Sequence, residues 1–356
     1  MSRKLMTSLL IAMCVCVASR GFGQEPTKAE ARVVVEGDGT VHVPAQTVAP
    51  SEFLSPEAKA YVAQHLKDMQ DPEAVKQDGG VPRFMKPMLE HDRAAYAVDK
   101  KDTSIAGVHV YDYRPTAGIA AGNRDRVLVN LHGGGFSGCW PACAELESMP
   151  LAAMMGVRVV SVDYREGPTY KFPAASEDVA AVYRELLKSY KPGAIGIYGC
   201  SAGGMLTAMS VAWFQTHGLP RPGAVGIFCA SAGSFGGDAT AFAFPLGEAR
   251  MAGGSAPSTS QLGYFSTAKP GDPMVSPIVS REVLAAFPPT LLMTGDRDFA
   301  FSGAVYTETQ LARLGVETEL HVWDGLFHGF FYSTDVPESR DAFGMMARFF
   351  DRHLVK

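Results

Sequence analysis

Charge is scarce in this sequence, and it shows no basic surplus. Charged residues make up 19% of the chain, and 32 basic side chains stand against 37 acidic ones, which gives a net charge of −5. Without a basic surplus we expect no nucleic-acid partner. Internal repeats and low-complexity tracts are also missing, which excludes solenoid, fibrous and disordered classes. The 356 residues, 47% of them hydrophobic, therefore predict one large ordered domain with a small lid.

Long apolar runs are confined to the N-terminus. Arg3 and Lys4 precede an uncharged and mostly apolar stretch, residues 5–18, and small residues lie among positions 19–23. This order is typical of an export signal, with cleavage expected after Gly23. Because the stretch is shorter than the about 20 residues that cross a bilayer, we expect no stable membrane span. We therefore predict a signal peptide over residues 1–23 and a periplasmic or secreted protein.

Cysteine is also rare, with six residues, of which Cys14 and Cys16 belong to the expected signal. The others are Cys139, Cys143, Cys200 and Cys229. An oxidising compartment permits disulfides, but the pairing of these four cannot be read from sequence. Cys139 and Cys143 have no matching His or second Cys pair at zinc spacing, so we expect no metal site.

The order of patterns along the chain indicates its organisation. Residues 24–50 resemble an extended arm, and residues 51–104, with a helix expected from Pro56, form an N-terminal cap segment. From residue 105 to 356, strands and helices alternate, which predicts an α/β class with a mostly parallel sheet flanked by helices. Within this catalytic domain, periodicity is lost over residues 231–280, where we expect a cap insertion. The expected strands are 108–113, 126–132, 157–163, 194–199, 224–230, 290–295 and 319–323, and the expected helices are 174–190, 204–216, 304–314 and 341–353.

The motif Gly199-Cys200-Ser201-Ala202-Gly203 lies between an expected strand and an expected helix. Glycines on both sides allow a sharp turn that leaves the serine hydroxyl exposed at the helix N-terminus. The motif alone is weak evidence, but its position between strand and helix strengthens it. Ser201 is therefore the predicted nucleophile.

A glycine-rich loop, His132-Gly133-Gly134-Gly135-Phe136, follows another expected strand. Consecutive glycines let backbone N–H groups turn towards a developing oxyanion, where each such donor contributes about 3 kcal/mol. We predict an oxyanion hole formed by Gly133 and Gly134 together with Ala202. A flexible surface loop is the alternative, but it would not account for the downstream serine motif.

A base and its orienting acid should follow the serine. His321 and His353 fall within an expected strand and helix, whereas His328 lies in a loop after the last strand and is the predicted base. The segment Thr294-Gly295-Asp296-Arg297-Asp298 offers two carboxylates at a strand end, and its spacing alone does not choose between Asp296 and Asp298.

Several motifs together resemble one family. They are His132-Gly133-Gly134-Gly135-Phe136, Val162-Asp163-Tyr164-Arg165, Phe172-Pro173-Ala174-Ala175, Cys200-Ser201-Ala202-Gly203-Gly204, Asp272-Pro273, Ser276-Pro277 and His328-Gly329-Phe330. Over residues 105–350 the chain is similar to the bacterial hormone-sensitive-lipase-like esterases, family IV of the α/β-hydrolase superfamily. The resemblance implies an α/β-hydrolase core, a cap and cofactor-free hydrolysis of esters with short to medium acyl chains. It also implies that Asp298, at the position of the family's acid, is the third member of the triad.

Two departures from that family stand beside the active site. Cys200 occupies the position directly before the nucleophile, where the family usually has an acidic residue. Glu166-Gly167-Pro168-Thr169 replaces the usual Leu-Ala-Pro-Glu. Cys200 fits a packing residue, a disulfide partner or a group that tunes the turn. Candidate walls of the substrate pocket, each of which also fits an ordinary core position, are Phe136, Trp140, Tyr264, Phe265, Phe299 and Phe327.

These features predict a serine carboxylesterase that acts through Ser201, His328 and Asp298 and an acyl-enzyme intermediate, without metal or organic cofactor. The same triad also serves a deacetylase of acetylated carbohydrate, a lactonase or an amidase. A non-catalytic binding protein on the same scaffold is disfavoured because all three triad residues are present. The expected partner is a small ester. The oligomeric state stays open, a homodimer included.

Overall fold

A computed structural model describes residues 32–233, 235–249 and 263–355. The chain divides into two compact units, residues 1–49 and 50–356. In the first unit a short hairpin pairs β1 (Val34–Val35) with β2 (Val41–His42), where the sequence suggested only an extended arm. The expected signal peptide and its cleavage site after Gly23 lie outside the described residues.

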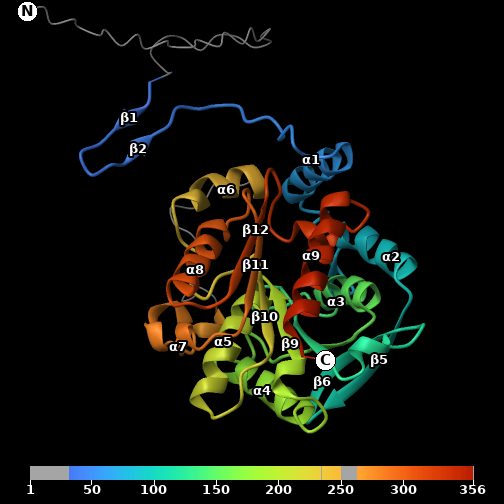
Figure 1. The fold of residues 1–356 in the computed structure, drawn as a ribbon. Coiled ribbons are helices and arrows are strands. Elements are labelled where there is room, and N and C mark those ends of the chain that lie inside the picture. The colour runs from blue at the N-terminus through green and yellow to red at the C-terminus, as the bar shows by residue number, and fades with distance from the viewer. Residues whose placement is uncertain (1–31, 234, 250–262, 356) are drawn as a thin grey trace, which may run out of the picture. The chain divides into compact units, whose positions relative to one another are not determined.

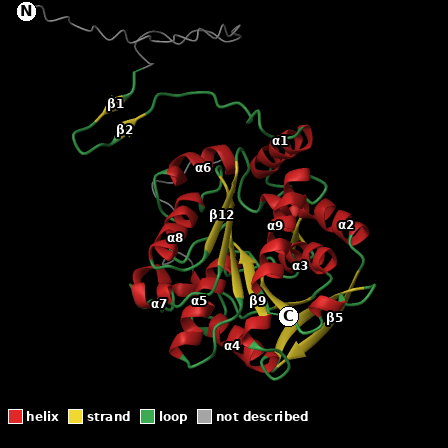
Figure 2. Ribbon diagram, viewed as in Figure 1, coloured by secondary structure: helices red, strands yellow, loops and turns green. Residues whose placement is uncertain are grey.

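An eight-stranded sheet forms the centre of the second unit, in the order β12-β11-β10-β9-β7-β8-β6-β5 (Figures 1 and 2). The strands from β7 to β12 pair in parallel, and β5 and β6 pair antiparallel at one edge. Their bounds are β5 Val98–Ile105, β6 Val108–Pro115, β7 Val127–Leu131, β8 Arg158–Val162, β9 Ile195–Cys200, β10 Ala224–Phe228, β11 Thr290–Gly295 and β12 Thr318–Trp323. A small hairpin, β3 (Gln77–Asp78) with β4 (Val81–Pro82), stands apart from this sheet. The predicted α/β-hydrolase fold with a mostly parallel sheet is confirmed.

Helices cover both faces of the sheet because every residue of β7, β9, β10 and β11 is buried, and such strands need cover on both sides. Helices α4, α5 and α8 pack on one face, and α3 and α9 on the other. Their bounds are α3 Ala142–Met155, α4 Ala174–Leu186, α5 Ala202–Thr216, α8 Phe301–Arg313 and α9 Pro337–His353, and a short α7 spans Arg281–Ala285.

Three helices surround the site described below: α1 (Pro56–Gln70), α2 (Lys86–Ala95) and α6 (Ala239–Glu248). Helix α1 contacts α6 and α9 (Figure 1). Its N-terminus is capped by Ser55, which also donates its backbone N–H and its hydroxyl to Glu338 at 2.7 and 2.9 Å. Helix α6 falls within the expected insertion at 231–280, of which residues 234 and 250–262 lie outside the described part of the chain.

Neither α3 nor β5 was predicted from the sequence, for different reasons. Every residue of α3 from Ala142 to Ala152 is buried, so the helix has no polar face and no helical period to reveal it. Strand β5, with sequence VDKKDTSI, is a charged and mostly exposed edge strand that resembles a loop in composition. Within the described residues, no helix is both long and apolar enough to cross a membrane.

Candidate active site

Ser201 occupies a sharp turn between β9 and α5. Its backbone has φ 57° and ψ −120°, a region that costs a non-glycine residue about 1 to 3 kcal/mol. The turn requires close backbone approach, since a Cβ atom added to Gly203 would stand 1.7 Å from the carbonyl oxygen of Leu131. The Ser201 N–H donates to the carbonyl of Phe228 at 2.8 Å, which anchors the turn to β10. The strain is thus held by packing that leaves the serine at the helix N-terminus.

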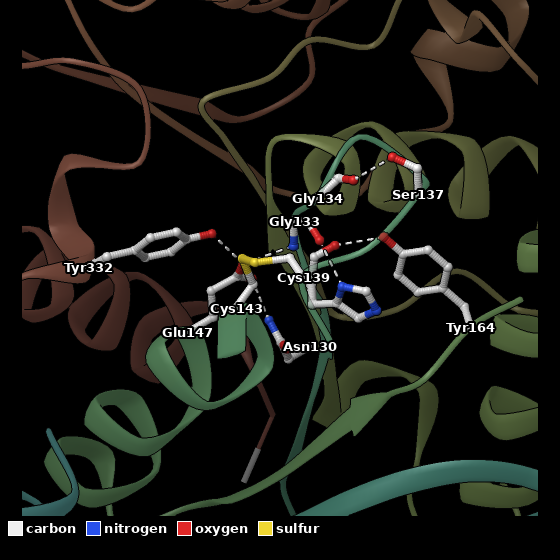
Figure 3. The surroundings of a disulfide bond; sticks show 10 residues. Asn130, Gly133, Gly134, Ser137, Cys139, Cys143, Glu147, Tyr164 and Tyr332 are labelled. Atoms are coloured by element: carbon white, nitrogen blue, oxygen red, sulfur yellow. Dashed lines mark hydrogen bonds between the residues drawn. A yellow bond between two sulfur atoms is a disulfide. The ribbon is translucent and has the colours of Figure 1, made fainter. Parts of the chain in front are cut away.

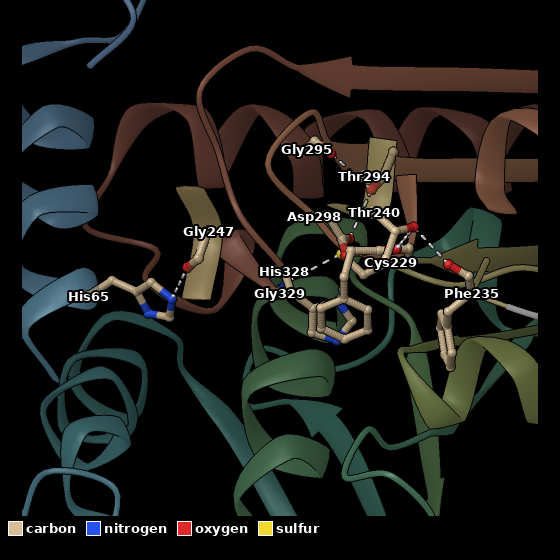
Figure 4. A network of polar contacts seen from close by, with 12 residues as sticks. His65, Cys229, Phe235, Thr240, Gly247, Thr294, Gly295, Asp298, His328 and Gly329 are labelled. Carbon is tan, nitrogen blue, oxygen red and sulfur yellow. Dashed lines mark hydrogen bonds and ion pairs between the residues drawn. The ribbon is translucent and has the colours of Figure 1, made fainter. Parts of the chain in front are cut away.

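His328 and Asp298 lie in contact, with His328 Nδ1 2.8 Å from Asp298 Oδ1 (Figure 4). Asp298 is fully buried and also accepts the hydroxyl of Thr294 at 2.9 Å and the N–H of Ala300 at 2.8 Å. Burial raises the pKa of Asp298, but the neighbouring His328 and these hydrogen bonds outweigh it, so the net pKa lies below the usual value. The carboxylate therefore stays ionised.

The same pair acts on the imidazole in the opposite direction. Burial lowers the pKa of His328, whereas the charge of Asp298 and its hydrogen bond raise it, and the net shift is upwards. The ring stacks on Phe299 with centroids 4.1 Å apart, and the next N–H along the chain, that of Gly329, donates to Cys229 Sγ at 3.3 Å. His328 is therefore held in orientation by an anion, an aromatic face and an anchored loop.

The rival acid and bases lie elsewhere. Asp296 accepts the N–H of Gly325 at 2.7 Å, and burial raises its pKa. His321 lies 3.3 Å from Glu319 within β12, and His353 belongs to the last turn of α9. The carboxylate in contact with the loop histidine is that of Asp298.

The glycine loop differs in detail from the expected oxyanion hole. The N–H of Gly133 donates to the buried carboxylate of Glu147 at 3.0 Å, so it is already engaged. Gly134 and Gly135 line the cavity that contains Ser201, and Gly134 has φ 120° with Gly138 O only 1.9 Å from where a Cβ would stand. Of the two predicted glycines, Gly134 therefore lines this cavity, with Gly135 beside it, whereas the N–H of Gly133 is bonded to Glu147.

Ala202 is the first residue of α5, and the Ser201 side chain makes no capping hydrogen bond to that helix. The first N–H groups of a helix have no partner inside it and carry a partial positive charge. The Ala202 N–H is therefore suited to an anion beside Ser201.

A cavity of about 230 Å³ contains Ser201 and His328. The other lining residues are Tyr61, His65, Met69, Phe84, Met85, Met88, Gly134, Gly135, Cys143, Cys200, Glu248, Phe327, Gly329 and Tyr332. Many of them come from the N-terminal cap segment, and His65 of α1 stacks on Phe327 with ring centroids 3.5 Å apart. Flexible methionines and aromatic rings make this an adaptable apolar pocket.

Of the six expected pocket walls, all within the described residues, Phe327 lines this cavity. Phe299 stands behind His328, while Phe136, Tyr264 and Phe265 form a buried aromatic cluster with centroids 4.9 to 5.0 Å apart. Trp140 packs on Tyr111 at 4.6 Å. The cap residues that do line the cavity had no distinguishing sequence signal, because their arrangement depends on how the cap segment docks.

A second cavity of about 400 Å³ shares Tyr61, His65, Phe84 and Met88 with the first. Its remaining walls are Gln64, Asp68, Pro87, His91, Ser333 and Asp335. The two cavities thus adjoin, and the walls of the second are more polar than those of the cavity at Ser201.

The four cysteines within the described part of the chain divide into a bonded pair and two thiols. Cys139 and Cys143 form a disulfide directly after the glycine loop (Figure 3). Cys200 and Cys229 are free and buried. Cys200 is therefore a packed thiol beside the nucleophile, not a disulfide partner, and burial raises the pKa of the neighbouring Cys229 well above its usual value.

Cys229, Asp298 and His328 bring one ligand-type atom each within 4.8 Å of one another, a set that could in principle hold a metal ion. Each group already has a partner: His328 contacts Asp298, and Cys229 accepts the N–H of Gly329. A protonated thiol is also a poor ligand, since metals bind the thiolate. The donor set fits an acid–base pair better than a metal centre.

Comparison with known proteins agrees with this geometry. A family model described as alpha/beta hydrolase fold matches residues 128–332. An acetyl-hydrolase from Streptomyces hygroscopicus is 27% identical over 233 residues, which cover 63% of this chain and 75% of that protein. The crystal structure of esterase E25 has a TM-score of 0.75 at 25% identity, covering 88% of this chain and 99% of that one.

An esterase from the bacterial hormone-sensitive lipase family shares the fold, with a TM-score of 0.70 at 23% identity over 85% of this chain and 99% of its own. The fold and the esterase class drawn from the sequence motifs are confirmed. The chain belongs to the alpha/beta hydrolase fold family and is a carboxylesterase- and lipase-like hydrolase.

Proposed function

We propose that the protein is a serine carboxylesterase that cleaves esters of short to medium acyl chains through Ser201, His328 and Asp298. The observation that carries the proposal is the His328–Asp298 contact of 2.8 Å at the cavity that also contains the strained Ser201. Nucleophile, orienting acid and base follow one another in the chain order of this fold.

In the proposed reaction, His328 removes the hydroxyl proton of Ser201 as the oxygen attacks the ester carbonyl. The imidazolium that forms is stabilised by the ionised Asp298, and its proton then leaves with the alcohol. Water, activated by the same imidazole, attacks the acyl-enzyme and releases the acid. Each step uses only side chains of this chain and water.

The negative charge on the carbonyl oxygen needs donors that are not already engaged. We assign this role to the N–H groups of Gly134, Gly135 and Ala202, because Gly133 donates to Glu147. Loss of one such donor typically costs about 10²- to 10³-fold in kcat.

The acyl preference is inferred from the cavity that contains Ser201. Its volume of about 230 Å³ is below the roughly 300 to 1,000 Å³ of sites for drug-sized ligands, which favours short acyl groups. A second candidate is a deacetylase of acetylated carbohydrate. It is favoured by the second cavity, whose polar residues Gln64, Asp68 and Asp335 suit a hydroxylated leaving group. It is also in keeping with the similarity to an acetyl-hydrolase.

The test is hydrolysis of a chromogenic ester series from two to sixteen carbons, with wild type and Ser201→Ala. We expect the highest kcat/KM at the short end and a loss of about 10⁴- to 10⁶-fold in the variant. An acetylated sugar measured beside the simple acetate decides between the two candidates. A wild type that cleaves none of these compounds, or an alanine variant with full activity, would refute the proposal.

We also propose export to the periplasm or the medium. The basic start and apolar stretch of residues 1–18 support it, as does a disulfide, which persists in oxidising compartments. N-terminal sequencing of protein recovered from periplasm and medium should begin near residue 24. Recovery of the uncut chain from the cytoplasm alone would contradict export.

A further inference from the structure

Glu147 is a buried carboxylate with no role in the reaction just described. It lies on α3, only 1% exposed, on the side of Ser201 where the glycine loop runs. A buried carboxylate is costly unless its oxygens accept hydrogen bonds. Glu147 accepts three hydrogen bonds: from Asn130 Nδ2 at 2.7 Å, from the Gly133 N–H at 3.0 Å and from the Tyr332 hydroxyl at 2.7 Å (Figure 3).

These donors belong to separate parts of the active site. Gly133 begins the oxyanion loop directly before Gly134, and Tyr332 lies four residues after His328. The backbone of Cys200, directly before the nucleophile, lowers the pKa of Glu147 and so lies close to its carboxyl. One side chain therefore binds the oxyanion loop and the histidine loop and adjoins the nucleophile turn.

The packing around Gly133 shows how closely these parts meet. A Cβ atom added at Gly133 would lie 3.1 Å from the Tyr332 hydroxyl, 3.3 Å from the carbonyl of Cys200 and 3.6 Å from Glu147 Oε1. The network continues inwards, since Asn130 accepts the Ser161 hydroxyl at 2.8 Å. The anchor of the loops is thus fixed to the central sheet.

We propose that Glu147 is a positioning residue of the esterase reaction, which sets the oxyanion loop against the nucleophile turn and the histidine loop. The inference rests on the proposed function and deepens it. Burial raises the pKa of Glu147, and its hydrogen-bond donors lower it by less, so the net pKa is about 7. Its hydrogen-bond acceptors are all used by groups that must not move during catalysis.

The first test compares Glu147→Gln with wild type on a short ester at pH 8. The amide keeps the size of the side chain, but one oxygen becomes an NH₂ group that cannot accept a hydrogen bond. Either the bond from Asn130 to Oε2 or the bonds from Gly133 and Tyr332 to Oε1 are therefore lost. Loss of such supporting contacts costs about 10- to 100-fold, and we expect it in kcat with KM changed less than about threefold. A merely structural role would lower the amount of folded enzyme without this split.

Glu145 is the matched control, since it lies on the same helix, is equally buried and pairs with Arg93 and Lys100 instead of the active site. Glu145→Gln should leave the kcat of the folded enzyme unchanged. Thermal unfolding and active-site titration give the folded fraction of each variant. An equal kcat loss in both variants would overturn the proposal, as would full kcat in Glu147→Gln.

A rescue experiment uses the position of Cys200. Cys200 and Tyr332 line the same cavity, and the thiol raises the pKa of the Tyr332 hydroxyl, so an aspartate at position 200 would offer that hydroxyl a second carboxylate. In the wild-type background we expect Cys200→Asp to lower kcat, because the new aspartate would lie close to the Glu147 carboxylate. In the Glu147→Gln background, where that carboxylate is absent, the same substitution should raise kcat at least about fivefold. A further loss in the double variant would overturn the proposal.

Tyr332→Phe serves if Glu147→Gln does not fold. It removes one donor to the carboxylate at constant shape, and we expect a kcat loss smaller than that of the glutamine variant. Unchanged kcat in Tyr332→Phe would contradict the proposal. In every case a wild type without esterase activity refutes the proposed function, whereas an active wild type with insensitive variants refutes this inference alone.

Discussion

Two buried carboxylates flank Ser201, Asp298 on the histidine side and Glu147 on the oxyanion side. Both are almost completely buried, and both accept three or more hydrogen bonds. Their pKa values nevertheless shift in opposite directions, downwards for Asp298 and upwards to about 7 for Glu147. The difference lies in the partner, because Asp298 faces a group that becomes a cation and Glu147 faces neutral donors.

The comparison separates two uses of the same chemical group. A carboxylate beside an imidazole stabilises a charge that appears during the reaction, so its contribution is to kcat directly. A carboxylate among neutral donors bears the full desolvation cost of its own charge and contributes by fixing geometry. The histidine side should therefore respond most strongly to removal of charge, and the oxyanion side to removal of acceptors.

Of the two carboxylates, Asp298 should give the larger effect, measured in Asp298→Asn. Without the anion, His328 loses both the partner that fixes its tautomer and the charge that stabilises the imidazolium. Kcat on a short ester should fall by about 10³- to 10⁴-fold. Asp296→Asn is the control, because Asp296 contacts Gly325, and it should lose less than about tenfold. A larger loss for Asp296 would exchange the roles assigned to the two residues.

The pH dependence of kcat/KM sharpens the same side of the comparison. The base must be neutral, and Asp298 holds the pKa of His328 above its usual value, so activity rises as pH passes that raised pKa. In Asp298→Asn the largest upward contributions to the imidazole pKa are lost, while burial still lowers that pKa. The residual activity should therefore reach its plateau at lower pH than in wild type. If kcat/KM of Asp298→Asn rises over the same pH range as that of wild type, a group other than His328 controls this rise.

The sequence predicted the histidine side far better than the oxyanion side. Ser201, Asp298 and His328 follow strand ends in this order, and Ser201 and His328 stand in local motifs that can be recognised without the fold. Asp298 was chosen over Asp296 by the family resemblance. Glu147 has no such motif, since it lies in a helix that is buried all round and was not expected. Its partners are 14 to 185 residues away, so only tertiary packing brings them together.

Cys200 shows the limit of motif comparison. The sequence marked it as a departure beside the nucleophile but left its role open between packing, disulfide and tuning. In the structure the Cys200 backbone lies close enough to Glu147 of α3 to lower its pKa, so an acidic group is present near the turn although the neighbouring residue is a thiol. The chain position of a functional group is thus less constrained than its position in space.

Glu147 should also make stability depend on pH. The carboxyl has a pKa of about 7 in the folded protein against an ordinary 4.5, so between these values the folded state holds a proton that the unfolded state has lost. Stability therefore falls as pH rises from 4.5 to 7 and is constant above. The penalty is about 3 kcal/mol at most, from about 1.4 kcal/mol per pKa unit.

Urea unfolding of wild type and Glu147→Gln at pH 4.5 and pH 7.5 measures this term. The free energy of unfolding of wild type should fall relative to the variant by up to about 3 kcal/mol on going to the higher pH. Asp92 and Glu166, whose pKa values are raised to about 7 as well, act equally in both proteins and cancel. A constant difference between the two proteins would show that Glu147 has no raised pKa.

The smallest expected effect comes from the disulfide, which only the oxyanion side possesses. Cys139 and Cys143 close a loop of five residues, for which chain entropy gives about 2 kcal/mol of stabilisation. The double variant Cys139→Ser/Cys143→Ser should lose that much in the free energy of unfolding. A Cβ atom at Gly134 would lie only 2.8 Å from Cys139 Cβ, so the cavity-lining loop packs against this bridge. The kcat of the double variant should therefore fall as well, but by less than about tenfold.

Reduction provides the control for that variant. A thiol reductant should reproduce the loss in wild type and have no further effect on the double variant, since Cys200 and Cys229 are already reduced. If reduction instead lowered the kcat of both proteins alike, the bridge would not be the cause. If the bridge is the cause, and Glu147→Gln still costs more kcat than its removal, the oxyanion loop is held chiefly by hydrogen bonds to a buried carboxylate. The covalent tie would then stabilise the fold more than the reaction.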